Sequence, residues 1–201
     1  MTRNQQTMKT KHLDIGCGSN PRNPFNYDEL YGVDIIEQSV TNFNYTQCNV
    51  IFDNLPFEDS TFDSVSAFDF LEHIPRTATI NNQGMFPFIH VMNEIYRVLK
   101  PDGRFYAITP AYPRVEAFVD PTHVNFITKK THAYFTVPKL KGQMYGFSGK
   151  FETVRRVKWV KLSQETKSVN SIVKILNNIL YTILYRKKSH LLWNFKAVKD
   201  M

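Results

Sequence analysis

The sequence is poor in the residues that fix a small fold by covalent bonds or metal ions. Its 201 residues include only two cysteines, Cys17 and Cys48, whose separation matches no metal-ligand spacing. We therefore predict a reduced, cytoplasmic protein with no metal site. The amino-terminal stretch MTRNQQTMKTKH also lacks the apolar run of a signal peptide.

Long apolar runs are missing as well. Residues 169–185 form the most apolar stretch, but Asn170, Lys174 and Asn177 interrupt it, and a membrane-spanning helix needs roughly 20 apolar residues. This excludes a transmembrane segment at the level of the sequence. With 42% hydrophobic and 14% aromatic residues, the chain can still bury a core. Its length favours one domain over residues 1–201, present as a monomer or a homodimer.

Charge is divided unevenly between the two halves. Residues 1–110 carry 8 Lys and Arg against 13 Asp and Glu, whereas residues 111–201 carry 17 against 5. An acidic half suits a positively charged ligand, and a basic half attracts an acidic substrate, nucleic acid or an anionic membrane. A merely solvated basic face explains the second half equally well.

Apolar segments and a helical pattern alternate along the first half. One apolar face at spacings of three and four predicts a helix over residues 86–100, and Pro101 and Gly103 end it. Alternation of this kind predicts an α/β fold with a mostly parallel sheet. The predicted strands are residues 9–15, 31–35, 45–51, 62–68, 104–109, 151–161 and 191–198.

A second amphipathic helix is predicted near residues 169–186, followed by basic residues up to Lys188. We favour a helix that packs on the sheet or on a second copy of the chain. The alternative is an interfacial helix that makes peripheral membrane contact through residues 169–188.

A pair of glycines at the end of the first predicted strand indicates a ligand site. Gly16 and Gly18 let the backbone turn sharply and approach a ligand closely. A dinucleotide fingerprint would have a third glycine where this chain has Pro21, so a pyrophosphate cofactor and a nicotinamide-dependent oxidoreductase are disfavoured. Asp34, at the end of the second strand, can accept hydrogen bonds from both hydroxyls of a ribose. Asn49 could meet an adenine amine, or it could be an ordinary turn residue.

Five motifs in this order resemble class I S-adenosylmethionine (SAM) dependent methyltransferases of type 11. They are LDIGCG at 13–18, GVD at 32–34, LPFEDSTFD at 55–63, LEHI at 71–74 and EIYRVLKPDG at 94–103. The resemblance implies a Rossmann-like three-layer sandwich. Its sheet would have about seven strands, with an antiparallel last strand and helices on both faces.

The resemblance also implies SAM as cofactor and S-adenosylhomocysteine as product. Residues 1–110 would then form the cofactor half, and residues 111–201 the acceptor half. The methionine carboxylate would be bound by Asn20, Arg22 or a backbone amide. The predicted cofactor-binding residues are Asp14, Gly16, Cys17, Gly18, Asn20, Asp34, Ile35, Asn49, Val50, Phe68, Asp69 and His73.

Two histidines are candidate general bases for methyl transfer, where a base helps if the nucleophile is a hydroxyl. His73 lies four residues after Asp69, and a packed or capping histidine is the more ordinary interpretation. His123 follows Asp120 in the motif DPTH, which an Asx turn with a surface histidine also explains. We rank His123, with Asp120, above His73.

The acceptor predicted from the sequence is a small molecule, acidic or sugar-like, methylated on oxygen or nitrogen. No separate nucleic-acid module is visible, although the basic second half leaves RNA or another acidic substrate as an alternative. A SAM-binding protein without catalysis is the second alternative.

Overall fold

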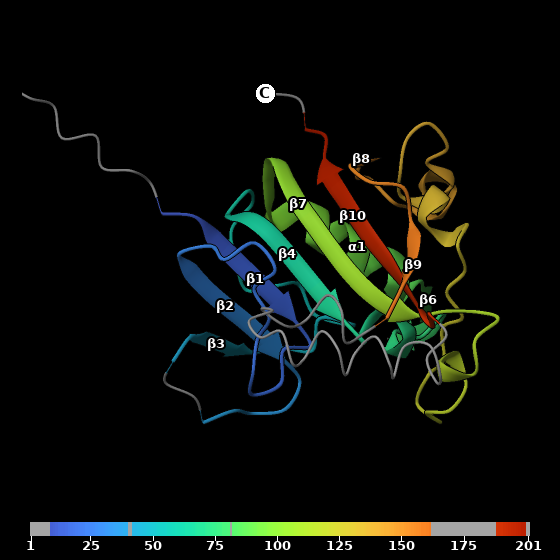
Figure 1. Ribbon diagram of the computed structural model, residues 1–201, viewed down its shortest axis with the longest axis horizontal. Helices are drawn as coiled ribbons and strands as arrows, with labels where there is room; N and C mark the ends of the chain where they lie inside the picture. Colours follow the sequence, from blue (N-terminus) through green and yellow to red (C-terminus); the bar gives the residue numbers. More distant parts are fainter. Residues whose placement is uncertain (1–8, 40–41, 81, 162–187, 200–201) are drawn as a thin grey trace, which may run out of the picture.

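The computed structural model describes residues 9–39, 42–80, 82–161 and 188–199 (Figure 1). The helix predicted near residues 169–186 lies outside the described residues. Within them, no helix is both long enough and apolar enough to cross a bilayer.

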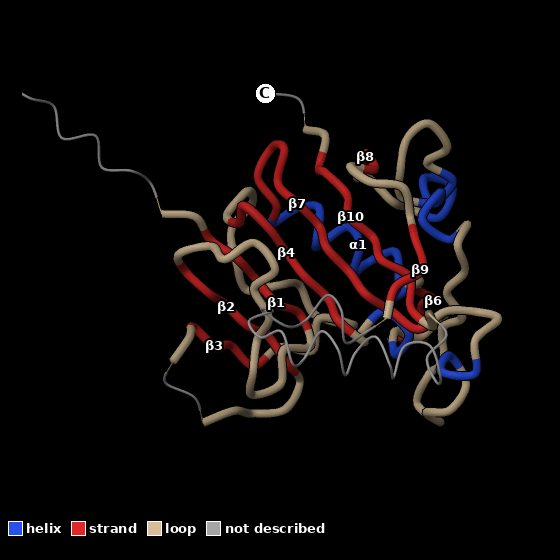
Figure 2. Tube along the Cα trace, viewed as in Figure 1, coloured by secondary structure: helices blue, strands red, loops and turns tan. Residues whose placement is uncertain are grey.

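One large sheet carries most of the described chain (Figures 1 and 2). Its order is β3-β2-β1-β4-β7-β10, and two short strands, β8 and β9, both pair with β10. Strands β1 to β4 and β7 run parallel, whereas β10 runs antiparallel to its neighbours, as predicted. The strands of the sheet are β1 (Lys11–Ile15), β2 (Glu29–Asp34), β3 (Asn44–Gln47), β4 (Phe62–Phe68), β7 (Leu99–Pro110), β8 (Phe151–Thr153), β9 (Lys158–Val160) and β10 (His190–Ala197).

The first face of the sheet packs against helix α1 (Pro87–Val98), which lies behind β7 and β10 in Figure 1. Side chains alternate along a strand, so Leu13 and Ile15 of β1 point to this face. They share one core with Val91 and Ile95 of the helix, all fully buried. Burial of each such side chain contributes about 2 kcal/mol.

The motifs around residues 55–63 and 94–103 hold α1 in place. Glu94 accepts a hydrogen bond from the Leu55 amide at 2.7 Å, and the Arg97 guanidinium donates to the Leu55 and Phe57 carbonyls at 2.9 and 2.7 Å. Arg97 also pairs with Glu94 at 2.7 Å and with Asp59 at 2.9 Å. These residues serve the architecture of the fold rather than a ligand site.

The opposite face of the sheet carries a smaller cluster of apolar side chains beneath the loop at residues 17–28. The ring of Phe25 packs on Tyr106 of β7 at a centroid distance of 5.8 Å. Phe68 and Ile108 belong to the same cluster. Since α1 is the one α-helix among the described residues, helices on both faces stay a prediction.

Two predicted strands differ from the structure, and one hairpin was not predicted. The strand expected over residues 151–161 is split into β8 and β9, because the four residues 154–157 lie opposite only two residues of β10, 193 and 194, and leave the pairing. The strand expected over 45–51 ends at Gln47, and the Phe52 and Asp53 amides close a turn on the Asn49 carbonyl. A hairpin of β5 (Ala78–Ile80) and β6 (Gln83–Met85) was not predicted.

Four 3-10 helices lie outside the sheet. Of these, η1 directly follows β4, and η2 follows β7, so both start at the edge where the parallel strands end. The four are η1 (Leu71–His73), η2 (Val115–Ala117), η3 (Thr131–Tyr134) and η4 (Lys141–Tyr145).

Candidate functional site

The glycine pair forms a tight turn where β1 ends. Gly16 and Gly18 have φ angles of +68° and +53°, the left-handed region that residues with a Cβ rarely adopt. A Cβ on Gly16 would lie 2.8 Å from the ring of Phe70, which is too close. The Gly16 and Cys17 amides donate to the Val33 carbonyl at 2.9 and 3.2 Å. The turn is therefore fastened to the end of β2.

Asp34 meets this turn. Its Oδ2 accepts a hydrogen bond from the Gly18 amide at 2.9 Å, and its Oδ1 accepts one from the Ile36 amide at 3.0 Å. Each carboxylate oxygen can accept a second hydrogen bond. Since Asp34 is only half-buried, a ligand with two neighbouring hydroxyls could reach it. The structure thus brings the glycine pair and Asp34 together, as the sequence predicts.

Asp14 lies under the turn and is fully buried. Its oxygens accept hydrogen bonds from the Arg22 amide at 2.8 Å and the Ser66 hydroxyl at 2.5 Å, and burial raises its pKa to about 7. Ser66 also bonds to Nε2 of His12 at 2.8 Å, and Ser64 bonds to Nδ1 at 2.6 Å. Asp14 fastens the loop at residues 17–28 to the sheet and offers no exposed oxygen to a ligand.

Cys17 takes part in the glycine turn through its backbone amide, whereas its thiol points into the protein. The side chain is buried, and Sγ lies 3.2 Å from the Gly18 carbonyl. Burial raises the pKa of this thiol to about 12, so it stays neutral and unreactive at physiological pH. A Cβ on Gly32 would lie 2.7 Å from this sulfur, so β2 needs its glycine there.

The remaining predicted cofactor residues border the turn at the carboxyl ends of β2, β3 and β4. Ile35 is 56% exposed, whereas Val50 is buried and Asn49 lies in the turn after β3. Asn20 is exposed. The Phe68 carbonyl accepts a hydrogen bond from Arg22 at 3.3 Å. All of these residues lie at the edge where the parallel strands end.

Asp69 begins the second part of this edge, directly after β4. Its φ of +49° turns the chain away from the sheet, and its amide donates to the Ile108 carbonyl at 2.9 Å. Its Oδ1 lies 3.2 Å from Nε2 of His190, at the start of β10. Asp69 therefore ties β4 to the two strands that follow it in the sheet.

The two candidate bases lie together. The rings of His73 and His123 are in edge contact, with centroids 4.8 Å apart. Nδ1 of His73 lies 3.0 Å from the Thr122 hydroxyl, and Thr122 donates to Asp120 at 2.6 Å. Nε2 of His123 lies 4.0 Å from Asp120. From the sequence, these histidines were alternative candidates for the base, whereas in the fold they form one cluster.

Glu72 completes this cluster, although the sequence analysis does not select it. It is 1% exposed, and its Oε2 accepts a hydrogen bond from Thr109 at 2.9 Å. Its Oε1 lies 3.9 Å from Nε2 of His123. Burial raises the pKa of Glu72 to about 8. The one available signal is its place beside His73 in the LEHI motif.

A comparison with protein families finds a match in the first half of the chain. The family model of the methyltransferase domain matches residues 13–107. This stretch is similar to that family. SAM is the cofactor that the family implies, and the residues present fit it, since the glycine turn leaves room for a ligand beside the Asp34 carboxylate. Among curated proteins, none matches the chain.

Solved structures share the fold of this chain at low sequence identity. The YcgJ protein of Bacillus subtilis is 15% identical, with a TM-score of 0.54 over 96% of this chain and 93% of that one. A SAM-dependent methyltransferase of Archaeoglobus fulgidus is 18% identical, with a TM-score of 0.51 over 95% of this chain and 86% of that one.

A third similar structure comes from a complex. The complex joins the Trm112 methyltransferase activator and a putative methyltransferase of Haloferax volcanii. The matching chain is 14% identical, with a TM-score of 0.58 over 95% of this chain and 84% of that one.

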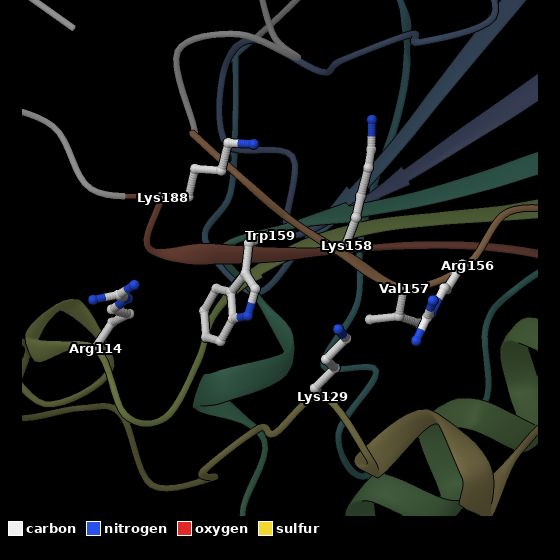
Figure 3. A pocket seen from close by; sticks show the side chains of 7 residues that line it. All are labelled: Arg114, Lys129, Arg156, Val157, Lys158, Trp159 and Lys188. Carbon is white, nitrogen blue, oxygen red and sulfur yellow. The ribbon is translucent and has the colours of Figure 1, made fainter. Parts of the chain in front are cut away.

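A basic cavity of about 610 Å³ lies outside the matched stretch, beside β9 (Figure 3). None of its described lining residues is acidic. Arg114 stacks over the ring of Trp159 at 5.6 Å, and its Nε has no hydrogen-bond partner among the described residues. The lining residues are Arg114, Lys129, Arg156, Val157, Lys158, Trp159 and Lys188.

Proposed function

We propose that the protein transfers a methyl group from SAM to an oxygen or nitrogen atom of a small, acidic, sugar-like acceptor. The observation that carries the proposal is the meeting of two groups of residues at one sheet edge. The ring of Phe70 lies against Gly16 of the glycine turn, and Glu72 and His73 come two and three residues after Phe70. A ligand on the turn would thus lie beside the histidine cluster.

The cofactor half supplies residues for each part of SAM. Asp34 would accept hydrogen bonds from the ribose hydroxyls, and the turn after β3, with Asn49 and Val50, would border the adenine. Arg22 is held at the end of β4 by its bond to Phe68 and would pair with the methionine carboxylate. When bound, SAM supplies a methyl group on a positively charged sulfur. The protein contributes by aligning acceptor and methyl group and by excluding water.

The histidine cluster would act on the acceptor. Nδ1 of His123 lies 3.3 Å from the Ala117 carbonyl, which can only accept, so Nδ1 carries the hydrogen. Its Nε2 therefore has a free electron pair, which can accept a proton from an acceptor hydroxyl or orient that hydroxyl. Asp120, 4.0 Å away, would stabilise the charged imidazolium.

The basic cavity supports an acidic acceptor. Arg114 belongs to the segment that joins the end of β7 to Asp120, and Lys188 is two residues from His190, which contacts Asp69. The cavity therefore borders the same sheet edge. Five cationic side chains line it, and none of its lining residues within the described part of the chain is acidic (Figure 3). A carboxylate or phosphate on the acceptor could bind there, with the reacting hydroxyl directed towards the histidines.

RNA remains the second candidate acceptor, because the same cavity combines cations with the indole of Trp159, on which a base can stack. We favour the small acceptor, since only one aromatic ring lines the cavity among the described residues. Single-strand binders use several such rings in succession.

Release of S-adenosylhomocysteine tests the proposal. The protein is incubated with SAM and, separately, with hexuronic acids, sugar phosphates, neutral sugars and short RNA. We expect turnover with an acidic sugar, and a rate at least about 100-fold lower for His123→Ala. Asp120→Ala should have a smaller effect. Wild-type rates in both variants would end the role of this pair.

Calorimetry with S-adenosylhomocysteine separates the remaining alternatives. Binding without turnover on any acceptor would favour the SAM-binding protein that lacks catalysis. Turnover on RNA alone would replace the small acceptor. Absence of binding would overturn the proposed cofactor site itself.

A further inference from the structure

Three side chains at this sheet edge bring possible metal-ligand atoms close together. Glu72, His73 and His123 each offer one ligand atom, and these atoms all lie within 4.8 Å of one another. Two of them, Oε1 of Glu72 and Nε2 of His123, are 3.9 Å apart. Ligand atoms around one zinc ion lie roughly 3.3 to 4 Å apart, because each is about 2 Å from the metal. Shifts of about 1 Å would bring the three ligand atoms to the spacing found around one zinc ion.

Glu72 is one of four residues in the described part of the chain that bury a side-chain polar atom without a hydrogen-bond partner. Its side chain is 1% exposed, and Thr109 satisfies Oε2. Oε1 is buried and has no hydrogen-bond partner among the described residues. A buried carboxylate oxygen without a donor is costly, and native proteins usually pair it with a donor or a cation. This oxygen lies on the side of Glu72 that faces His123.

The hydrogen bonds of His73 fix which of its ring nitrogens is free. The hydroxyl of Thr122 has one hydrogen, which it donates to Asp120 at 2.6 Å. Thr122 must therefore accept from Nδ1 of His73, 3.0 Å away, so Nδ1 carries the hydrogen. Nε2 of His73 is left with an electron pair, as is Nε2 of His123 above the Ala117 carbonyl. Outer hydrogen bonds of this kind orient histidine ligands in metal sites.

From this arrangement we propose that Glu72, His73 and His123 bind one divalent transition-metal ion, such as Zn²⁺. Two imidazole nitrogens and one carboxylate oxygen suit zinc or ferrous iron. Mg²⁺ prefers oxygen ligands and suits the cluster less well. Three protein ligands leave a coordination position open, as in catalytic zinc sites.

The role of the ion rests on the proposed function. The open position would take the hydroxyl oxygen of the acceptor, and the cation would lower the pKa of that hydroxyl. The hydroxyl proton is released to water. The oxygen then forms a bond to the methyl carbon while the carbon–sulfur bond breaks, and its electron pair stays on sulfur as S-adenosylhomocysteine. The histidines would thereby act through the metal instead of as bases.

Titration of the chelator-treated full-length protein with Zn²⁺, followed by calorimetry, tests the site. We expect one ion per chain. His73→Gln and His123→Gln should each weaken binding by on the order of 100-fold, and Thr122→Val by about 10-fold. Thr122→Ser, which keeps the hydroxyl, should bind Zn²⁺ with the affinity of the wild type. His90→Gln, which removes a histidine on α1 away from the cluster, is the matched control and should bind like the wild type.

Two further measurements identify the metal ligands and check that each variant is folded. Absorption of bound Co²⁺ reports the ligand set, and the His123→Gln variant should lose the spectrum of the wild type. Binding of S-adenosylhomocysteine shows that each variant is folded. If the wild type does not bind Zn²⁺ saturably, or if both histidine variants bind it equally well, the metal site is wrong. If the ion binds but no acceptor is methylated, the site stands and the proposed function falls.

Discussion

The two halves of the sheet edge are built in different ways. On the cofactor side, the glycine turn and Asp34 are joined through backbone amides, with the Gly18 amide 2.9 Å from the carboxylate. On the acceptor side, side chains from three separate segments meet, namely Glu72, Thr109 and His123. A site made of backbone and short motifs is visible in a sequence. One made of distant side chains needs the fold.

The two halves also differ in electrostatics. Asp34 lies in an acidic half of the chain and is half exposed, so it can meet a ligand whose charge is positive. Arg114 and its cationic neighbours line the cavity near the acceptor edge. The difference suggests that the cofactor and the acceptor are selected by charges of opposite sign.

The largest effect is expected on the cofactor side. Asp34→Ala removes both acceptors for the ribose hydroxyls and the partner of the Gly18 amide, and hydrogen bonds to charged groups contribute about 1.5 to 3 kcal/mol each. We expect S-adenosylhomocysteine to bind on the order of 1000-fold more weakly by calorimetry. Glu37→Ala removes a nearby exposed charge and should leave the affinity unchanged. A loss below about 5-fold for Asp34→Ala would place the ribose elsewhere.

A smaller effect is expected below the cofactor turn, where His12 is buried and bonded to Ser64 and Ser66. Burial lowers the pKa of His12 to about 4 from 6.5. Between these values, the unfolded chain takes up a proton that the native state refuses, so this residue's contribution to stability falls as the pH falls. The raised pKa of Asp14 works in the opposite direction. A variant is therefore needed to isolate the histidine.

His12→Asn provides that comparison. The stability advantage of the wild type over this variant should shrink by about 2 kcal/mol from about pH 8 to about pH 5, measured as the free energy of unfolding in urea. His90→Asn, at a partly exposed position on α1, is the control. An advantage that is constant with pH would mean that His12 titrates with the same pKa in the folded and the unfolded chain.

The local pattern of apolar residues in the sequence was sufficient to predict much of the fold. Short apolar runs predicted β1 and β4, and an apolar face at spacings of three and four predicted α1, because these residues are buried in the core. The pattern was insufficient for residues 151–161, where residues 154–157 are two more than the partner strand β10 can pair and interrupt the strand. Such an interruption depends on the partner strand and leaves no periodic trace in the sequence.

The candidate site also divides into residues that the sequence predicts and residues that only the fold brings together. The sequence predicted that the glycine pair and Asp34 lie together, and the structure confirms their proximity. The cofactor contact predicted for Asp14 stays a prediction, and both oxygens of Asp14 accept hydrogen bonds within the protein. Glu72 was missed, because its hydrogen-bond partner Thr109 and its neighbour His123 lie far along the chain. Polar residues in a motif can be ligands or structural groups, and only their tertiary partners tell which.

The smallest effect is expected in the basic cavity, where it tests the electrostatic half of the comparison. Arg114→Ala removes a guanidinium that lines the cavity and stacks on Trp159. With an acidic acceptor, KM should rise by about 5- to 10-fold and kcat should change little, because the lost contact is remote from the reacting atoms. The increase should diminish with added salt, since partly exposed charges are screened. Lys139→Ala makes the same change in charge outside the cavity and should leave KM unchanged. An equal rise in KM for a neutral acceptor would mean that Arg114 shapes the cavity instead of recognising charge, and the contrast between the two halves would then lie in their construction alone.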